Sequence, residues 1–247
     1  MTRLTVFLHG FTGHADSWDE VIARLPEGER ALAITLSAHD FDPAPAPTTY
    51  DQEVDRIAAI VNAEHADRVR VCGYSLGGRI ALGLLARHPA LFASAILIGA
   101  NPGLSTDGER AARATQDEEW AKLAEREGTE AFIAAWSAQP LFASQLRLAP
   151  ETQRAQREKR LRHSARAIAT AMRNFSLAKM PNFWPELPRI STPTRFLAGE
   201  LDTRFVDIGR RLASTMPNAI LCIAKDVGHN VVLEAPDETS IALRSLD

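Results

Sequence analysis

Residues 73–78 read GYSLGG, and this stretch decides the fold. It matches the pattern G-x-S-x-G, in which a serine occupies a sharp turn between a strand and a helix. An apolar run from Val69 to Gly73 precedes it, and Ile80 to Ala86 follows with helical spacing. Glycines on both sides leave room for the turn, because side chains there would clash. We therefore expect Ser75 at the end of a strand, facing the amino end of a helix.

Strand and helix patterns alternate on both sides of this turn. Such alternation predicts parallel strands joined by right-handed helical crossovers, with helices on both faces of the sheet. The expected strands are Leu4–Leu8, Ala31–Leu36, Val69–Gly73, Ala93–Ile98, Thr194–Ala198 and Ala219–Ala224. The expected helices include Trp18–Leu25, Tyr50–Ala63 and Pro236–Leu246, and a proline-rich loop is expected from Asp42 to Thr49.

The segment 103–181 has no strand pattern and is charged with helical spacing of its apolar residues. We interpret it as a helical cap inserted into a single domain, whose core comprises residues 1–102 and 182–247. The fold class is therefore α/β: a mostly parallel, doubly wound sheet of the α/β-hydrolase type with a helical cap insertion.

A serine hydroxyl needs an imidazole oriented by a carboxylate before it can act as a nucleophile or base. In this fold the chain order is Ser, then Asp or Glu, then His. Asp202 and His229 each follow a predicted strand, where open α/β sheets place their ligands. We predict Ser75, Asp202 and His229 as the catalytic residues, with Glu200 and Asp226 as rival acids.

Backbone N–H groups of Phe11 and Leu76 are the expected oxyanion hole, because one follows the first strand and the other follows the serine. His9 begins the turn that leads to Phe11, so we expect it to form structural hydrogen bonds. The remaining histidines are expected in solvated or capping positions: His14, His39, His65, His88 and His163.

Arginines form the second chemical signal. Arg79 lies one helical turn after Ser75, near the same site. The cap adds further arginines, of which most are expected on solvated helix faces: Arg110, Arg113, Arg154, Arg157, Arg160, Arg162 and Arg166. Because guanidinium groups bind carboxylates bidentately, the cap favours a polyanionic small molecule. Trp136 either closes over a ring or belongs to the cap core.

The net charge, the cysteines and the lengths of the apolar stretches argue against several classes of protein. The net charge of −3 argues against a general nucleic-acid binder. Cys72 and Cys222 are expected as reduced thiols in buried strands, and no zinc spacing occurs. The first residues lack the pattern of a signal peptide, and no apolar stretch reaches the roughly 20 residues that span a bilayer. We expect a cytoplasmic protein without membrane insertion; the sequence leaves homo-oligomerisation open.

Five segments together resemble a specific family. They are 6–13 (VFLHGFTG), 73–79 (GYSLGGR), 101–104 (NPGL), 109–113 (ERAAR) and 136–142 (WSAQPLF). In these segments the chain is similar to the 2-succinyl-6-hydroxy-2,4-cyclohexadiene-1-carboxylate synthases of menaquinone biosynthesis, members of the α/β-hydrolase superfamily. The serine turn is common to the superfamily, whereas the cap segments are far more specific.

The resemblance implies a carbon–oxygen lyase rather than a hydrolase. In such an enzyme the serine removes a ring proton from 2-succinyl-5-enolpyruvyl-6-hydroxy-3-cyclohexene-1-carboxylate, and pyruvate leaves. Arginines hold the substrate carboxylates, and no metal or organic cofactor is implied. By motif, the substrate-binding residues would be Tyr74, Arg79, Arg113, Trp136, Phe142 and Arg160, with Arg162 as the alternative to Arg160.

One loop departs from the family pattern. Many relatives have Leu-Pro-Gly-His-Gly after the second strand, whereas residues 36–40 read LSAHD here, which predicts a changed pocket wall. Two other functions stay open. A carboxylesterase or carbon–carbon bond hydrolase would use Ser75 as an acyl nucleophile, and a non-enzymatic binding protein would retain only the fold.

Overall fold

The structure is a computed structural model that describes residues 3–39 and 49–245. Within them, six strands form one parallel sheet in the order β2-β1-β3-β4-β5-β6. The strands are β1 (Arg3–Leu8), β2 (Arg30–Ile34), β3 (Arg68–Tyr74), β4 (Ser94–Ile98), β5 (Thr194–Gly199) and β6 (Ala219–Ala224). The parallel sheet confirms the predicted fold class. Of the predicted proline-rich loop, residues 42–48 lie outside the described part.

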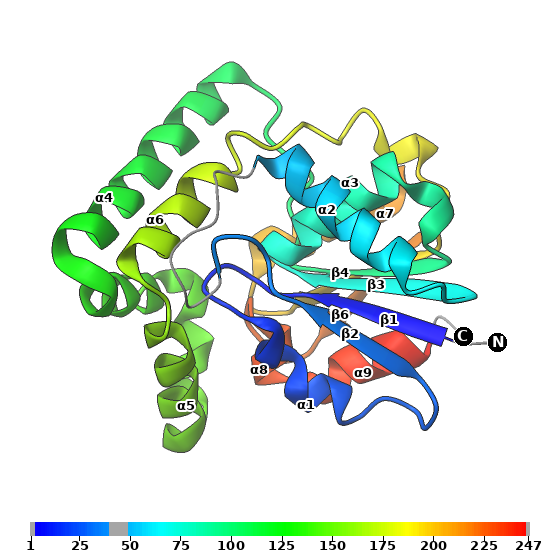
Figure 1. The fold of residues 1–247 in the computed structure, drawn as a ribbon, viewed down its shortest axis with the longest axis horizontal. Coiled ribbons are helices and arrows are strands. Elements are labelled where there is room, and N and C mark those ends of the chain that lie inside the picture. The colour runs from blue at the N-terminus through cyan, green and yellow to red at the C-terminus, as the bar shows by residue number, and fades with distance from the viewer. Residues whose placement is uncertain (1–2, 40–48, 246–247) are drawn as a thin grey trace.

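Helices cover both faces of the sheet (Figure 1). One layer contains α2 (Tyr50–Ala63), α3 (Leu76–Arg87) and α7 (Thr203–Thr215); the other contains α1 (Asp19–Ile22), α8 (Val231–Glu234) and α9 (Pro236–Arg244). Short 3-10 helices are η1 (Ala15–Trp18), η2 (Pro89–Leu91), η3 (Pro140–Arg147) and η4 (Leu187–Arg189). Neighbouring residues of β1 serve the two layers in turn, since Val6 packs in one core cluster and Phe7 in the other.

The central strands are apolar throughout because both of their faces are covered. Every residue of β4 is buried, and so are Leu4–Leu8 in β1. The strand register aligns the ends of three strands, since Leu8 pairs with Gly73 and Tyr74 pairs with Ile98. This alignment places the loops after β1, β3 and β4 next to one another at a single edge of the sheet.

The prediction that both cysteines lie in buried strands is wrong for Cys222. Cys72 is buried in β3, but Cys222 is only half-buried in β6, and both thiols are free. Ile220 and Ile223 of β6 are exposed. The reason is the position of β6, which is the outermost strand and which the helical layers cover incompletely.

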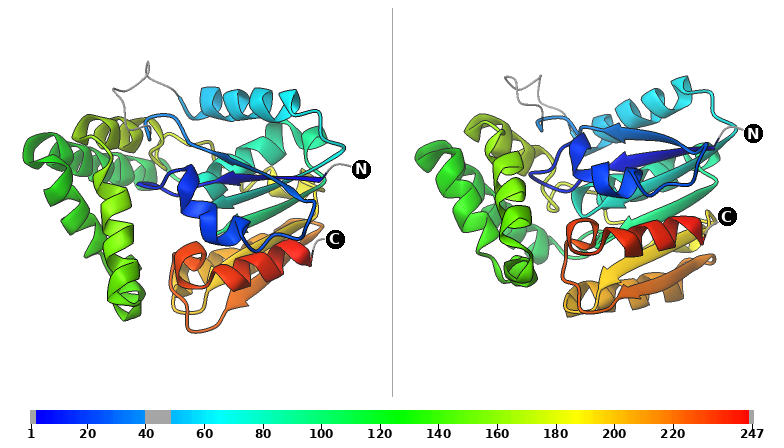
Figure 2. Two further views of the ribbon diagram at one scale, coloured as in Figure 1. Left: turned by 60° about the horizontal axis from the view of Figure 1, so that its bottom comes forward. Right: turned by 90° about the horizontal axis from the view of Figure 1, so that it is seen from below.

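The residues between β4 and β5 form α4 (Asp107–Ser137), α5 (Pro150–Leu161) and α6 (Ala165–Asn174). Thr106 caps α4, because its hydroxyl accepts the N–H of Glu109 and the Glu109 side chain returns to the N–H of Thr106. Gly128, at a φ of 84°, breaks α4 into two pieces. In the two views of Figure 2 these helices stand as a separate lobe beyond one end of the sheet.

The cap has a small apolar core of its own, to which Phe132, Ile133, Ile168 and Met172 belong. Within the described part of segment 103–181 all regular structure is helical, as the sequence predicts. The exact boundaries at residues 102 and 182 stay a prediction. Among the described residues, none of the helices has both the length and the apolarity needed to cross a bilayer.

Candidate active site

Ser75 occupies a strained turn between β3 and α3. Its φ of 51° and ψ of −105° lie in a region that side-chain-bearing residues rarely adopt. The N–H of Ser75 donates to the carbonyl of Ile98 at 2.8 Å, which fixes the turn against β4. The flanking glycines are needed for space: a Cβ at Gly73 would lie 2.3 Å from the carbonyl oxygen of Gly77, and one at Gly77 would lie 2.0 Å from that of Leu8.

Three predicted residues meet at this turn. His229 Nε2 lies 3.1 Å from Ser75 Oγ, and His229 Nδ1 lies 2.6 Å from Asp202 Oδ2. Both partners of the serine are buried, since His229 is 2% and Asp202 8% exposed. A carboxylate can only accept, so Nδ1 carries the proton and donates to Asp202. Nε2 is then free to accept the proton of the Ser75 hydroxyl.

The rival acids do not reach His229. Glu200 is exposed and accepts the N–H of Asp226 at 3.0 Å. Asp226 is itself exposed, at a turn with a φ of 58°. Of the three acids weighed from the sequence, Asp202 alone contacts His229.

The loop after β1 lies beside the serine and is held by His9. Nδ1 of His9 donates to the carbonyl of Gly10 at 2.8 Å, while Nε2 accepts the N–H of Leu36 at 3.0 Å. These bonds are the structural role predicted for His9. Phe11 and Leu76 both line the cavity at Ser75. Leu76 is the first residue of α3, where the N–H has no partner within the helix.

The serine opens into a cavity of about 580 Å³ between the sheet domain and the cap. The core and the cap both contribute to its wall. The six residues predicted to bind substrate all line it: Tyr74, Arg79, Arg113, Trp136, Phe142 and Arg160. The cavity is large enough for a substituted six-membered ring.

Arg160 is the most enclosed of the three arginines that were predicted to bind substrate. It is 5% exposed, and its guanidinium lies 5.3 Å from the centre of the Phe142 ring. Nη1 donates to Ser137 Oγ at 2.8 Å, whereas Nε is buried and has no hydrogen-bond partner among the described residues. Burial lowers the pKa of Arg160, as expected for a cation without a nearby carboxylate.

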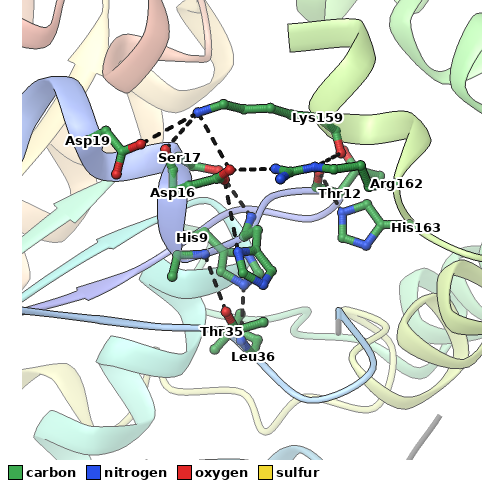
Figure 3. Close-up of polar contacts among 12 residues, drawn as sticks. His9, Thr12, Asp16, Ser17, Asp19, Thr35, Leu36, Lys159, Arg162 and His163 are labelled. Atoms are coloured by element: carbon green, nitrogen blue, oxygen red, sulfur yellow. Dashed lines mark hydrogen bonds and ion pairs between the residues drawn. The ribbon is translucent and has the colours of Figure 1, made fainter. Parts of the chain in front are cut away.

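Arg162, the alternative to Arg160, lies elsewhere. Figure 3 shows Arg162 and Lys159 of the cap directed toward Asp16, which belongs to η1 of the sheet domain. Lys159 Nζ also donates to the backbone carbonyl of Asp16 at 2.8 Å. This ion-pair cluster joins α5 to the sheet domain at the rim of the cavity.

Arg79 and Arg113 both line the cavity and lie close enough for the charge of one to act on the other. Arg79 Nη1 donates to the backbone carbonyl of Phe175 at 2.9 Å, and no carboxylate of the described residues pairs with Arg79. Burial, together with the neighbouring charge of Arg113, lowers the pKa of Arg79 to about 10. Arg79 therefore remains protonated at neutral pH and forms no ion pair with an acidic side chain of the described residues.

Trp136 packs in the cap core and also lines the cavity, so its closing over a ring stays a prediction. Its indole stacks on Phe132 with the ring centres 5.7 Å apart and packs edge-on against Phe11 at 5.0 Å. It also lines the cavity, and its indole N–H has no hydrogen-bond partner among the described residues. The ring is thus packed in the cap and available to a ligand at the same time.

The expectation that His39 and His163 are solvated or capping is wrong, because both are buried. His39 Nδ1 lies 3.0 Å from the carbonyl of Ser37, and His163 Nε2 lies 3.1 Å from that of Thr12. Burial lowers the pKa of His39 to about 3 and that of His163 to about 4. Their rings pack 5.8 Å apart, where α5 meets the loops after β1 and β2 (Figure 3 shows His163).

The other three histidines remain at positions of the expected kind. His14 stands at the amino end of η1, and His65 is exposed. His88 follows α3 and lies 2.9 Å from Asp55. None of the three lines the cavity.

Residues 36–39 of the departing loop do not form a cavity wall, contrary to expectation. Ala38 takes a φ of 59°, and the N–H of His39 donates to the carbonyl of Leu36 at 3.1 Å. His39 packs behind Phe11, so the loop supports the cavity from outside. Asp40, the last residue of the motif, lies outside the described residues.

Asp117 and Ser176 also line the cavity, and neither was predicted as a site residue. Asp117 is buried on α4, where it binds Arg113 Nε at 2.8 Å, and Ser176 donates to Asp117 at 2.6 Å. The spacing of Arg113 and Asp117, four residues apart on a helix, is a pattern that could have indicated their pairing. Their burial in the cavity depends on contacts between distant segments.

Fold and site together define an α/β hydrolase. The family model described as "Alpha/beta hydrolase family" matches residues 5–242, so the chain belongs to this family. Relatives named 2-succinyl-6-hydroxy-2,4-cyclohexadiene-1-carboxylate synthase are similar over nearly the whole chain. The one from Enterobacter sp. (strain 638) is 32% identical over 245 residues, which are 98% of this chain and 90% of the relative. The one from Serratia proteamaculans (strain 568) is 31% identical over 242 residues, with 97% and 91% covered.

Solved structures are also similar to this chain. The structure described as MenH from S. aureus has a TM-score of 0.95 and 30% identity, covering 100% of this chain and 94% of that one. An enol-lactonase from Burkholderia xenovorans LB400 has a TM-score of 0.83 at 19% identity, covering 100% and 91%, and shows the shared fold alone. The resemblance to the synthase family, first drawn from the sequence, is confirmed.

Proposed function

We propose that this protein is a carbon–oxygen lyase that eliminates pyruvate from 2-succinyl-5-enolpyruvyl-6-hydroxy-3-cyclohexene-1-carboxylate. The observation that carries the proposal is Arg160, a nearly enclosed guanidinium that pairs with no acidic side chain of the described residues, in the same cavity as Ser75. Burying a cation costs free energy unless an anion pairs with it. This cost supports a carboxylate as the ligand that pairs with Arg160. The similarity to enzymes named as synthases of the product supports this choice.

In the proposed reaction Ser75 is the base. His229 Nε2 accepts the hydroxyl proton, and Asp202 stabilises the resulting imidazolium at Nδ1. Ser75 Oγ then takes a ring proton of the substrate. The electron pair of the broken C–H bond shifts through the ring, and the C–O bond to the enolpyruvyl group breaks. The released enolate takes up the proton that His229 holds and becomes pyruvate, which returns His229 to its neutral form and makes the step a net elimination.

Negative charge develops on the substrate as the proton leaves. The N–H groups of Phe11 and Leu76 are the proposed donors to this charge, supported by their place on the cavity wall beside Ser75. Arg79, Arg113 and Arg160 would bind carboxylates of the substrate and fix the ring over Ser75. Tyr74, Trp136 and Phe142 would pack against the ring.

The test is a coupled pyruvate assay beside a panel of p-nitrophenyl esters. Purified protein should release pyruvate from the enolpyruvyl substrate and hydrolyse the esters slowly. Ser75→Ala should abolish pyruvate release while the circular dichroism spectrum stays unchanged. Rapid ester hydrolysis without pyruvate would instead favour the hydrolase alternative, in which Ser75 forms an acyl-enzyme. A cytoplasmic location and the absence of a nucleic-acid partner remain part of this proposal.

A further inference from the structure

A carboxylate lies in the cavity that the proposed function assigns to a polyanion. Asp117 is 3% exposed and lines the cavity together with Arg79 and Arg113. An acidic side chain at this place would repel a carboxylate ligand unless its charge served another group. Its contacts show which group that is.

Both oxygens of Asp117 are engaged. Oδ1 accepts the N–H of Arg113 Nε at 2.8 Å, and Oδ2 accepts the hydroxyl of Ser176 at 2.6 Å. Ser176 Oγ in turn accepts the backbone N–H of Ala178 at 3.0 Å. The carboxylate is therefore fixed between α4 and the segment after α6, with its charge directed at the guanidinium.

The bond to Nε leaves the outer edge of Arg113 available. Nε is the inner nitrogen of the group, and the two terminal nitrogens of Arg113 form no hydrogen bond to the described residues. A guanidinium held at one nitrogen can still present two parallel N–H groups to a carboxylate. Asp117 thus fixes the plane of Arg113 without occupying its ligand-binding edge.

Asp117 also acts on the charge balance with Arg79. The charge of Arg113 lowers the pKa of Arg79, whereas the charge of Asp117 opposes that effect. The two guanidinium groups and the one carboxylate together carry a single positive charge in this part of the cavity wall. One ligand carboxylate would neutralise it.

We propose that Asp117 is a positioning residue, which holds Arg113 at Nε so that Arg113, beside Arg79, binds one carboxylate of the substrate. The identity of the substrate rests on the proposed function, whereas the carboxylate class rests on the two arginines. Ser176 holds Asp117 in turn.

The test is a double-mutant cycle with Asp117→Asn, Arg113→Ala and the combined variant. The matched control is Glu119→Gln, on the same helix, where the exposed Glu119 pairs with Lys122. For each variant, KM and kcat for pyruvate release are measured. Calorimetry gives the Kd of 2-succinylbenzoate, an aromatic dicarboxylate, as a readout independent of turnover.

Asp117→Asn should raise KM and Kd on the order of tenfold, because Arg113 loses a charged hydrogen bond, and should change kcat less than about threefold. Glu119→Gln should leave both constants unchanged. In the Arg113→Ala background, Asp117→Asn should add nothing. Ser176→Ala should also raise KM, by a smaller factor than Asp117→Asn. If Asp117→Asn folds poorly, this variant tests the same contacts between Ser176, Asp117 and Arg113.

The inference is overturned if Asp117→Asn leaves KM and Kd unchanged, or raises them equally with and without Arg113. Pyruvate release by the wild type together with that result would contradict only the role of Asp117. Binding of 2-succinylbenzoate with the expected pattern, but without pyruvate release from the substrate, would contradict only the proposed function. A wild type that neither binds nor reacts would contradict both.

Discussion

His229 Nε2 and Ser75 Oγ lie 3.1 Å apart although 154 residues separate them in the chain. Ser75 directly follows β3, and His229 lies in the loop after β6. The two side chains therefore meet only when both strands are part of the folded sheet. The cap contributes neither residue. The proton-transfer geometry therefore belongs to the sheet domain, whereas the guanidinium groups of Arg113 and Arg160 belong to the cap.

Replacing Ser75 or Asp202, which are both hydrogen-bonded to His229, should remove activity without unfolding the protein. Ser75→Ala and Asp202→Asn should each lower kcat for pyruvate release by about 10⁴, since the first removes the base and the second removes the carboxylate that orients His229. Melting temperatures within a few degrees of the wild type would show that the fold is intact. Residual activity above a tenth of the wild type in either variant would contradict the assignment.

Arg160 and Arg162 form a matched pair for mutation, because they lie two residues apart on one chain segment. Arg160→Ala should raise KM roughly 30-fold, since a buried substrate carboxylate loses its partner. Arg160→Lys should restore only part of this loss, because an ammonium cannot bind bidentately. Arg162→Ala removes an exposed contact to Asp16 and should leave KM within about twofold. Equal effects of the two alanine variants would argue against a cavity role for Arg160.

The serine turn should be intolerant of side chains at Gly77. Gly77→Ala would place a Cβ 2.0 Å from the carbonyl oxygen of Leu8, so we expect a loss of about 3 kcal/mol or more in the free energy of unfolding. Gly108→Ala is the control, because no atom lies within 4 Å of its Cβ position in α4, and it should stabilise the protein by about 0.5–1 kcal/mol. Urea unfolding measures both. A Gly77→Ala variant as stable as the wild type would contradict the close approach of β1 and α3.

Stability should fall on acidification through the buried histidines. In the folded state the pKa of His39 is about 3 and that of His163 about 4, below the unfolded value near 6.5. The unfolded chain therefore binds more protons below pH 6.5, and the stability present above that pH is lost as the pH falls toward 4. Each histidine contributes a slope of about 1.4 kcal/mol per pH unit in this window.

His163→Asn should flatten this pH dependence relative to the wild type. The groups that face His163 are Thr12, His14, Asp16, His39 and Arg162. Urea unfolding at pH 7.0, 5.5 and 4.5 measures the slope, and the difference between variant and wild type removes the contribution of surface carboxylates. Parallel slopes for the two proteins would show that folding does not lower the pKa of His163.

The sequence predicts the sheet and the serine turn well because both depend on local patterns. The motif GYSLGG needs its glycines because the backbone turns sharply at Ser75. Apolar runs such as Ser94–Ile98 predict strands that are buried on both faces. The order Ser75, Asp202, His229 follows from the positions of strand ends. Each of these inferences uses residues that are close in the chain.

The sequence does not predict which residues become buried when segments that are distant in the chain pack together. His39 and His163 resemble polar loop residues until α5 packs on the loops after β1 and β2. Residues 160 and 162 differ by about 200° around a helix, so one must face away from the cavity, but the pattern does not say which. Asp117 looks like a solvated helix residue because nothing local indicates that the segment after α6 packs against it.

The most direct measurement of the central claim is the stoichiometry of pyruvate released by the purified protein. The enolpyruvyl substrate is supplied in limiting amount, and pyruvate is reduced by lactate dehydrogenase with NADH as the reporter. One pyruvate per substrate, formed by the wild type and not by Ser75→Ala, is the result expected. Unreacted substrate after prolonged incubation with folded wild-type protein would contradict the lyase assignment.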